Sequence, residues 1–380
     1  MADYLTFQQD IFWRATDTAV LLNPKMPCTE KPWLLKKSEV AGQVVFRTSG
    51  TEGTAKFVCL TREALLASAN AVNAHLATTP DDIWLGCLPW FHVGGLGIAA
   101  RAYAADCQAV FLQQKWDPTN FTRCCLDTEA TLTALVPTQV YDLVRAGCIA
   151  PTRLRAVLVG GGALAPLLNQ QARDLGWPIL CTYGMTETAS QVATQALAAS
   201  LGDPMKVLPI WETRLAPDDG SLHVRGPALL SGYMLDRKFI DPKSFDGWYQ
   251  TTDRVILQEG TLRFSRRHCG LVKIQGELVS LQESRDRQTQ LALEASVNPL
   301  AITAIALPDE RDGQRLVWVC DTHSDPASSE ALREKYNMSV AGPWRMLMKA
   351  RVPTLPRTEL GKLDERQLRR LVKALFTKSC

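Results

Sequence analysis

Residues 44–56 read Val44-Val-Phe-Arg-Thr-Ser-Gly-Thr-Glu-Gly-Thr-Ala-Lys56, a short apolar run that stops at a cluster of hydroxyl and glycine residues. A buried strand that enters a loop has this pattern. Glycines let backbone N–H groups approach phosphate oxygens, hydroxyl groups donate hydrogen bonds to them, and a lysine neutralises their charge. The spacing is not that of the common P-loop. The pattern is compatible with a phosphate-binding loop and equally with a surface turn. The binding residues of such a loop would be Thr48, Ser49, Gly50, Thr51, Glu52, Gly53 and Lys56.

On the C-terminal side of this stretch, strand-like and helical patterns alternate. A helical pattern starts at Thr61, and further ones cover Gln139–Ala146 and Leu164–Leu175. Helical stretches separate several of the strand-like apolar runs, which are Ala109–Leu112, Thr133–Val136, Ala156–Val159 and Pro178–Cys181. The alternation predicts an α/β fold in which helices cover layered sheets. After about Trp211, short strands punctuated by glycines predict a β-rich subdomain.

The polar and basic stretch Ser265-Arg-Arg-His268 is the expected domain boundary. It divides the chain into a large N-terminal domain, residues 1–267, and a small α+β C-terminal domain, residues 268–380. The second domain would contain strands near Ala301–Leu307 and Leu316–Cys320 and a final amphipathic helix.

Composition excludes several classes of protein. The chain has 380 residues, 46% of them hydrophobic, and a net charge of +3, too small to argue for a nucleic-acid partner. Its 11 cysteines include no C-x-x-C pair, which favours reduced thiols. No targeting peptide is visible, and no stretch approaches the roughly 20 apolar residues that span a bilayer. We expect a soluble cytoplasmic protein without membrane insertion.

Three more motifs are suited to nucleotide chemistry, each with a simpler alternative. Thr186-Glu187 follows a strand-like run, where a carboxylate can hold Mg²⁺ against phosphate oxygens, or Thr186 can cap a helix. The run Gly160–Ala163 lets the backbone approach a flat group such as a nucleobase, or simply makes a turn. Lys362 lies in a loop before the last helix, where most lysines are solvated.

Taken together and in this order, the four motifs resemble those of the adenylate-forming superfamily of acyl- and aryl-CoA ligases, luciferases and peptide-synthetase adenylation domains. The resemblance runs from about Val44 to Leu371. Trp248–Asp253 is similar to the family's ribose-binding segment, and Arg267 to the point where its C-terminal domain begins. The family implies an enzyme that uses ATP, Mg²⁺ and CoA and has a mobile C-terminal domain. It adds to the nucleotide-binding set Gly161, Gly162, Ala163, Tyr183, Asp253 and Arg267.

The resemblance also implies a two-step reaction. A substrate carboxylate attacks the α-phosphate of ATP and releases pyrophosphate, and the CoA thiol then attacks the acyl-adenylate. Lys362 would reach the carboxylate and the α-phosphate in the first step, while Glu187, beside Thr186, would be the metal ligand. The C-terminal domain is expected to rotate between the steps.

Local matches narrow the resemblance to the o-succinylbenzoate–CoA ligases of menaquinone biosynthesis. They are Leu88–Gly97 with Arg101 downstream, Val136–Gln139 and Tyr183–Gln191. Such a substrate keeps a second carboxylate, for which a buried arginine is a bidentate, permanently charged partner. Arg101 lies in an apolar stretch, although a surface position on a helix is the alternative. The predicted substrate site also contains three residues of these motifs, Gly94, Thr138 and Ser190. His92 would position the acyl group and ATP.

Two other functions stay open on the sequence. Another aryl- or acyl-CoA ligase would not need Arg101, and a non-catalytic nucleotide-binding relative would not need to retain Lys56, Glu187 and Lys362. A homo-oligomer is also compatible with the sequence.

Three features depart from the family's pattern. Cys269 stands where an acidic hinge residue is usual, Thr252 replaces the glycine before Asp253, and the segment before Val44 is short. A side chain at Thr252 is expected to crowd the turn.

Overall fold

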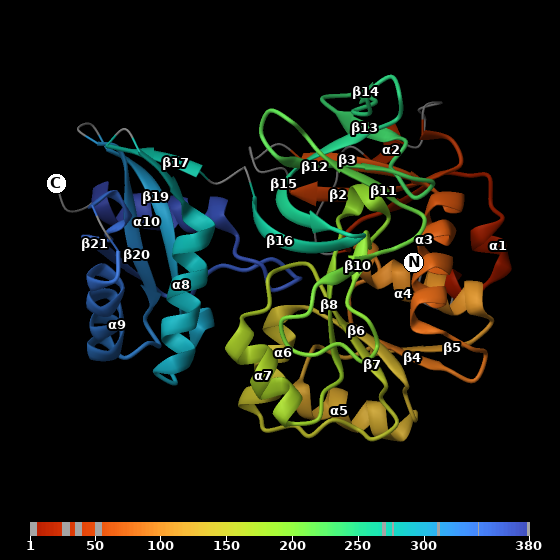
Figure 1. Cartoon of the computed structure of the whole chain (residues 1–380), viewed down its shortest axis with the longest axis horizontal. Coiled ribbons are helices and arrows are strands. Elements are labelled where there is room, and N and C mark those ends of the chain that lie inside the picture. Colours follow the sequence, from red (N-terminus) through yellow and green to blue (C-terminus); the bar gives the residue numbers. More distant parts are fainter. Residues whose placement is uncertain are drawn as a thin grey trace. The chain divides into compact units, whose positions relative to one another are not determined.

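The computed structural model describes residues 6–24, 31–34, 40–49, 55–267, 271–275, 277–309, 312–340 and 342–377 (Figure 1). The chain forms two compact units. The first comprises Met1–Leu164 and Asn169–Ser265, and the second comprises Arg266–Cys380 with Ala165–Leu168. The mixed α/β class expected from the sequence is confirmed.

An eleven-stranded sheet is the main layer of the first unit. In spatial order its strands are β11 (Glu212–Leu215), β12 (Ser221–Arg225), β15 (Tyr249–Gln258), β16 (Thr261–Arg267), β10 (Met205–Val207), β9 (Ala193–Thr194), β8 (Ile179–Tyr183), β7 (Ala156–Val159), β6 (Leu132–Leu135), β4 (Ile83–Gly86) and β5 (Gln108–Phe111). The last five run parallel to one another. All residues of β6 and β7 are buried, as expected for parallel strands covered on both faces.

Helices connect the parallel strands in regular alternation. They are α4 (Val93–Ala105), α5 (Pro118–Asp127), α6 (Pro137–Arg145) and α7 (Pro166–Asp174), coloured orange to yellow-green in Figure 1. The helix expected from Thr61 is α3 (Arg62–Leu76), and the Thr61 side chain caps it by accepting a 3.0 Å hydrogen bond from the Ala64 N–H. The shorter helices of this unit are α1 (Asp10–Trp13) and α2 (Lys31–Leu34).

A second, five-stranded sheet contains the strands β1 (Ala19–Leu21), β2 (Gln43–Ser49), β3 (Ala55–Thr61), β13 (Gly232–Leu235) and β14 (Lys238–Ile240), in this spatial order. The strands after Trp211, expected as a β-rich subdomain, do not form a sheet of their own. Most of them extend the large sheet, whereas β13 pairs with β3 in the small one. Each sheet thereby combines strands from distant parts of the sequence.

Hydrogen bonds between polar side chains link the amino ends of three parallel strands. Asp82, Thr131 and Arg155 immediately precede β4, β6 and β7. The Asp82 carboxylate accepts hydrogen bonds from Arg155 Nε at 2.8 Å and Nη2 at 2.7 Å, and from Thr131 Oγ1 at 2.6 Å. Burial alone would raise the pKa of Asp82, but these hydrogen bonds outweigh it and lower the pKa to about 2. This edge of the sheet is therefore held by a satisfied charge pair.

We predict that Asp82→Asn lowers the free energy of unfolding by about 2 kcal/mol at pH 7. Because the folded-state pKa is depressed, this stabilisation is present above the unfolded pKa near 4 and is lost as the pH falls towards 2. Denaturant unfolding at several pH values measures it. The exposed neighbour Asp81→Asn is the matched control and should change stability by less than about 0.5 kcal/mol; an equal loss in both variants would contradict the prediction.

The second unit is a three-stranded sheet covered by helices on both faces. Its strands are β19 (Ile302–Asp309), β20 (Gly313–Asp321) and β21 (Met348–Val352), and its helices are α8 (Leu281–Glu294), α9 (Pro326–Met338) and α10 (Glu365–Thr377). A hairpin of β17 (Leu271–Ile274) and β18 (Glu277–Ser280) precedes them.

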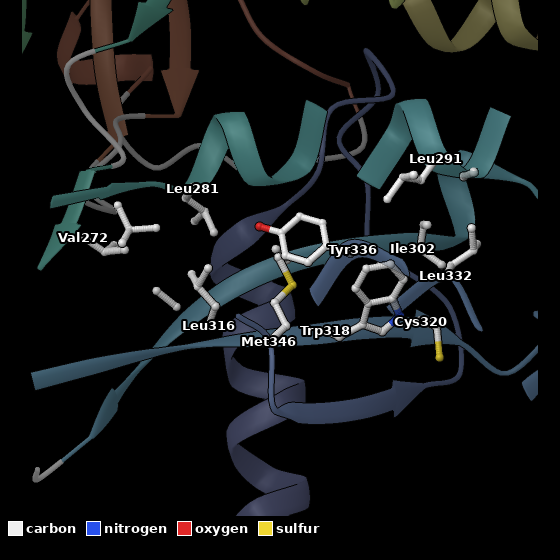
Figure 2. Close-up of a cluster of buried hydrophobic side chains, with 14 of the residues drawn as sticks. Val272, Leu281, Leu291, Ile302, Leu316, Trp318, Cys320, Leu332, Tyr336 and Met346 are labelled. Atoms are coloured by element: carbon white, nitrogen blue, oxygen red, sulfur yellow. The ribbon is translucent and has the colours of Figure 1, made fainter. Parts of the chain in front are cut away.

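Alternation along β20 divides the hydrophobic core of this unit into two clusters. Leu316 and Trp318 belong to the cluster in Figure 2, which also contains Leu281 of α8 and Tyr336 of α9. The intervening residues pack with Leu368 of α10 on the other side. The period of two matches the pleat of a strand whose two faces are both covered. Within the described ranges, no helix has the length and apolar character needed to cross a bilayer.

Candidate active site

Four of the predicted motifs follow neighbouring parallel strands at the same edge of the large sheet. The chain leaves β4 towards His92 and Gly94, β6 towards Thr138, β7 towards Gly161 and β8 towards Glu187. Their strand registers bring these exits together, since β6, β7 and β8 pair residue by residue. The carboxyl edge of a parallel sheet is where open α/β proteins bind ligands. The strand topology thus brings the predicted residues together at one edge of the sheet.

Two glycines at this edge are required because neighbouring atoms approach their α-carbons too closely for a side chain. A β-carbon on Gly160 would stand 2.6 Å from Thr182 Oγ1, and one on Gly184 would stand 1.6 Å from the Ser190 carbonyl oxygen. Gly161 has a positive φ of 77°, and Gly161, Gly162 and Ala163 are exposed beyond β7. A backbone platform of this kind is open to a flat ligand.

The loop after β8 is closed at its base and carries functional groups outwards. Gly184 and Ser190 approach each other at the base, and the Ser190 N–H donates to the Met185 carbonyl at 3.2 Å. Thr186–Thr188 form a single 3₁₀ turn, with the Met185 N–H donating to Thr188 Oγ1 at 3.1 Å. The alternative in which Thr186 caps a helix is therefore wrong.

Glu187 lies among side chains from two other elements, β3 and β13. Lys56 Nζ of β3 is 3.6 Å from Glu187 Oε1, and the Tyr233 hydroxyl of β13 donates to the same oxygen at 3.0 Å. The Lys56 ammonium also stands 3.3 Å from the centre of the Tyr233 ring. Burial lowers the pKa of Lys56, and Glu187 offsets part of that effect. The predicted phosphate lysine and the predicted metal ligand thus belong to one cluster.

Arg101 is buried, with 2% of its surface exposed. Its Nη2 donates to Ser190 Oγ at 3.2 Å, its Nε has no hydrogen-bond partner, and no carboxylate in the described ranges pairs with it. The guanidinium carbon lies 5.4 Å from the centre of the Trp84 ring. Burial without a compensating charge lowers the pKa of Arg101 to about 10. The surface alternative is wrong, and the site offers a cation that lacks an anion.

The predicted ribose segment is part of β15. Asp253 is 1% exposed and accepts a 2.9 Å hydrogen bond from the Tyr183 hydroxyl at the end of β8. The register of β15 against β12 shifts at this point, because His223 pairs with Gln250 and Ser221 with Arg254. The pairing of β15 with β12 is therefore irregular beside Asp253. The Thr252 side chain is exposed within the strand, so the expected crowding does not occur.

His92 and its neighbours begin α4. His92 is the half-buried residue before the helix, and its carbonyl accepts hydrogen bonds from the Gly95 and Leu96 N–H groups at 3.0 Å. Its ring lies 4.8 Å from that of Phe91. Gly94 and Thr138 are half-buried in the first turns of α4 and α6. These positions agree with a positioning role at the sheet edge, which stays a prediction.

Some predicted residues cannot be placed in the site. Gly50, Thr51, Glu52, Gly53 and Cys269 lie outside the described residues. Ser49 and Arg267 are described by their backbone, at the ends of β2 and β16. The predicted loop Thr48–Lys56 includes residues at both of its ends that belong to strands β2 and β3. Thr48 and Lys56 pair across the hairpin, and Thr48 Oγ1 donates to the Lys56 carbonyl at 3.2 Å.

Lys362, in the second unit, stands on a hydrogen-bonded turn rather than an irregular loop. The Thr358 N–H donates to the Lys362 carbonyl at 2.7 Å, and Gly361 has a φ of 69°. Arg357 donates to the Gly361 carbonyl at 2.8 Å and to the Leu300 carbonyl at 2.7 Å. The lysine side chain is exposed. Arg357, which the motif contains without an assigned role, thus fixes the turn that presents the lysine.

The geometry of this edge agrees with comparisons to known proteins. The model of the AMP-binding enzyme family matches residues 31–234, more than half of the chain. The chain belongs to the AMP-binding enzyme family.

Named relatives of this AMP-binding enzyme cover most of its length. A 2-succinylbenzoate–CoA ligase of Listeria monocytogenes is 29% identical over 349 residues, covering 90% of this chain and 72% of the relative. One of Bacillus mycoides is 30% identical over 358 residues, covering 87% and 70%. A structure of a single-substitution variant of E. coli MenE with bound OSB-AMS aligns with a TM-score of 0.68 at 26% identity, covering 86% of this chain and 68% of that one.

Sequence patterns missed two aromatic residues of this AMP-binding enzyme. Tyr233 bonds to Glu187, and its hydroxyl also lies 2.8 Å from that of Tyr249. Trp84 is fully buried beside Arg101, and its Nε1 has no hydrogen-bond partner within the described ranges. Each looks like an ordinary core aromatic on a strand. No local signal could have found them, because their partners lie on other elements.

We predict that Gly184→Ala destabilises the AMP-binding enzyme by about 3 kcal/mol or more, because the loop base must open to accept a methyl group. Gly162→Ala is the matched control. A β-carbon there meets its nearest neighbour, Pro137 Cγ, at an ordinary 3.6 Å, and stability should change by less than about 1 kcal/mol. Thermal unfolding of both variants tests this, and similar melting temperatures would contradict it.

Proposed function

We propose that this AMP-binding enzyme is an ATP-dependent o-succinylbenzoate–CoA ligase that acts in menaquinone biosynthesis. The observation that carries the proposal is Arg101, a buried guanidinium without an anionic partner, bonded to the loop that also carries Glu187. A substrate with a second carboxylate supplies the missing charge. The names of the two relatives and the OSB-AMS complex support this choice of substrate.

The first step joins the substrate carboxylate to the α-phosphate of ATP and releases pyrophosphate. This reaction needs positioning and charge stabilisation more than covalent help from the protein. Arg101 and Ser190 would hold the distal carboxylate, Tyr183 and Asp253 the ribose, and Lys56 the phosphates. Lys362 would bridge the reacting carboxylate and the α-phosphate.

Glu187 would hold Mg²⁺, which supplies charge neutralisation at the phosphates when it is bound. The described residues contain no group of three or more acidic, histidine or cysteine side chains that could bind a metal. Mg²⁺ in nucleotide sites usually takes one or two carboxylates and completes its shell with phosphates and water. The carboxylate donor at Glu187 fits that requirement.

In the second step the CoA thiol attacks the acyl carbonyl, the thioester bond forms and AMP leaves. We place Lys362 in a mobile C-terminal domain, residues 268–380, that rotates between the two steps. Cytoplasmic location belongs to the same proposal, and homo-oligomerisation stays open.

We predict that Arg101→Met separates activity from stability. Loss of the charge partner should reduce kcat/KM for o-succinylbenzoate by about 100-fold or more and leave the low rate with benzoate unchanged. Because the buried cation is uncompensated in the free protein, the variant should melt at the same or a higher temperature. Pyrophosphate release and thermal unfolding are the measurements. Equal wild-type rates with the two acids, or an unaffected variant, would refute the diacid substrate.

We predict that Lys362→Ala abolishes adenylation but spares thioester formation from pre-made acyl-adenylate. AMP formation with CoA present and absent separates the steps in the wild type, which should stall at the adenylate without CoA. Arg366→Ala, an exposed residue on α10, serves as the control and should leave both steps within about threefold of wild type. If Lys362→Ala retained adenylation, the assignment of this lysine would be wrong.

A further inference from the structure

The two carboxylate oxygens of Glu187 have different surroundings. Oε1 accepts the Tyr233 hydroxyl at 3.0 Å and faces Lys56 Nζ at 3.6 Å. Oε2 accepts no hydrogen bond from any residue in the described part of the chain. The side chain is 16% exposed. One oxygen is therefore fixed by the protein, and the other is left for a ligand.

Tyr233 is itself held in place from several sides. It lies on β13, where it pairs with Val58 of β3, two residues from Lys56 on the same face of that strand. This diagonal arrangement lets the Lys56 ammonium rest 3.3 Å from the ring centre. The Tyr249 hydroxyl lies 2.8 Å from that of Tyr233.

We infer that Tyr233 is a positioning residue for the magnesium site: its hydroxyl fixes Glu187 Oε1 and thereby presents Oε2 to the cation that accompanies ATP. A ligating carboxylate that is itself hydrogen-bonded is oriented by that bond, and such outer partners typically contribute 10- to 100-fold in metal affinity. The inference rests on the proposed function only in that Mg²⁺ with ATP is the ligand.

Lys56 competes with the Tyr233 hydroxyl for Glu187 Oε1, so the hydroxyl matters more for the orientation of the carboxylate. Without it, the Lys56 ammonium is the remaining partner of Oε1, and the carboxylate is free to turn towards the lysine. An incoming cation would then have to displace a closer ion pair and order a freer side chain. The Tyr233 ring has a separate effect, because it supports the lysine from the other side.

Two substitutions separate the hydroxyl from the ring. Tyr233→Phe removes only the hydroxyl, and the Mg²⁺ concentration that half-saturates ATP binding should rise by about 10-fold or more. ATP binding measured in EDTA should be unchanged. Tyr233→Leu also removes the ring that supports Lys56, so ATP binding should weaken in EDTA as well. Isothermal titration calorimetry on the full chain measures both affinities, and thermal unfolding establishes that each variant folds.

Tyr103→Phe is the matched control, since the exposed hydrogen bond that the Tyr103 hydroxyl donates goes to Asp10 and not to Glu187. It should show wild-type Mg²⁺ dependence. Unchanged Mg²⁺ dependence in Tyr233→Phe, or an equal loss of binding with and without Mg²⁺, overturns the inference while leaving the proposed function intact. A wild-type protein that binds no ATP in the presence of Mg²⁺ overturns the proposed function, and this inference with it.

Discussion

The backbone of Gly184 passes so close to the Ser190 carbonyl that a β-carbon would stand 1.6 Å from its oxygen. This approach closes the base of the loop that follows β8. Because the base is closed, the loop carries Glu187 to Lys56 and Tyr233 while Ser190 reaches Arg101. One backbone constraint thus joins the phosphate end of the site to the end that would hold a second carboxylate. The left-handed residues Ala189 and Ser190, with φ of 48° and 115°, show the local strain that the closure requires.

Buried charge is paired at one edge of the parallel sheet and left without a counter-ion at the other. At the amino edge, Asp82 and Arg155 satisfy each other, so the pair contributes to stability. At the carboxyl edge, Arg101 is buried against a neutral hydroxyl and an indole. A buried cation without an anion costs stability in the free protein, and a ligand that brings the anion recovers it. The uncompensated charge is therefore an expected property of a binding site and not of a scaffold.

The sequence predicted correctly those features that depend on residues close together in the chain. The strand at Ala156–Val159, the Thr61 helix start and the sheet-edge placement of Glu187 all depend on patterns within a few residues, and the structure agrees. Predictions were weaker where a contact crosses between elements. Thr48 and Lys56 proved to be paired strand residues because hairpin register is set by the partner strand.

By itself, the sequence determined the α/β alternation, the glycines at the strand ends and the residue types suited to phosphate, metal and carboxylate. Only the tertiary structure decided that Lys56 and Glu187 belong to one cluster and that the Tyr233 hydroxyl donates a hydrogen bond to one oxygen of the Glu187 carboxylate. It also decided that Arg101 is buried without a counter-ion. The physical reason is that hydrogen bonds and desolvation depend on distances between groups far apart in the chain, and β3, β8 and β13 meet only after two sheets have formed.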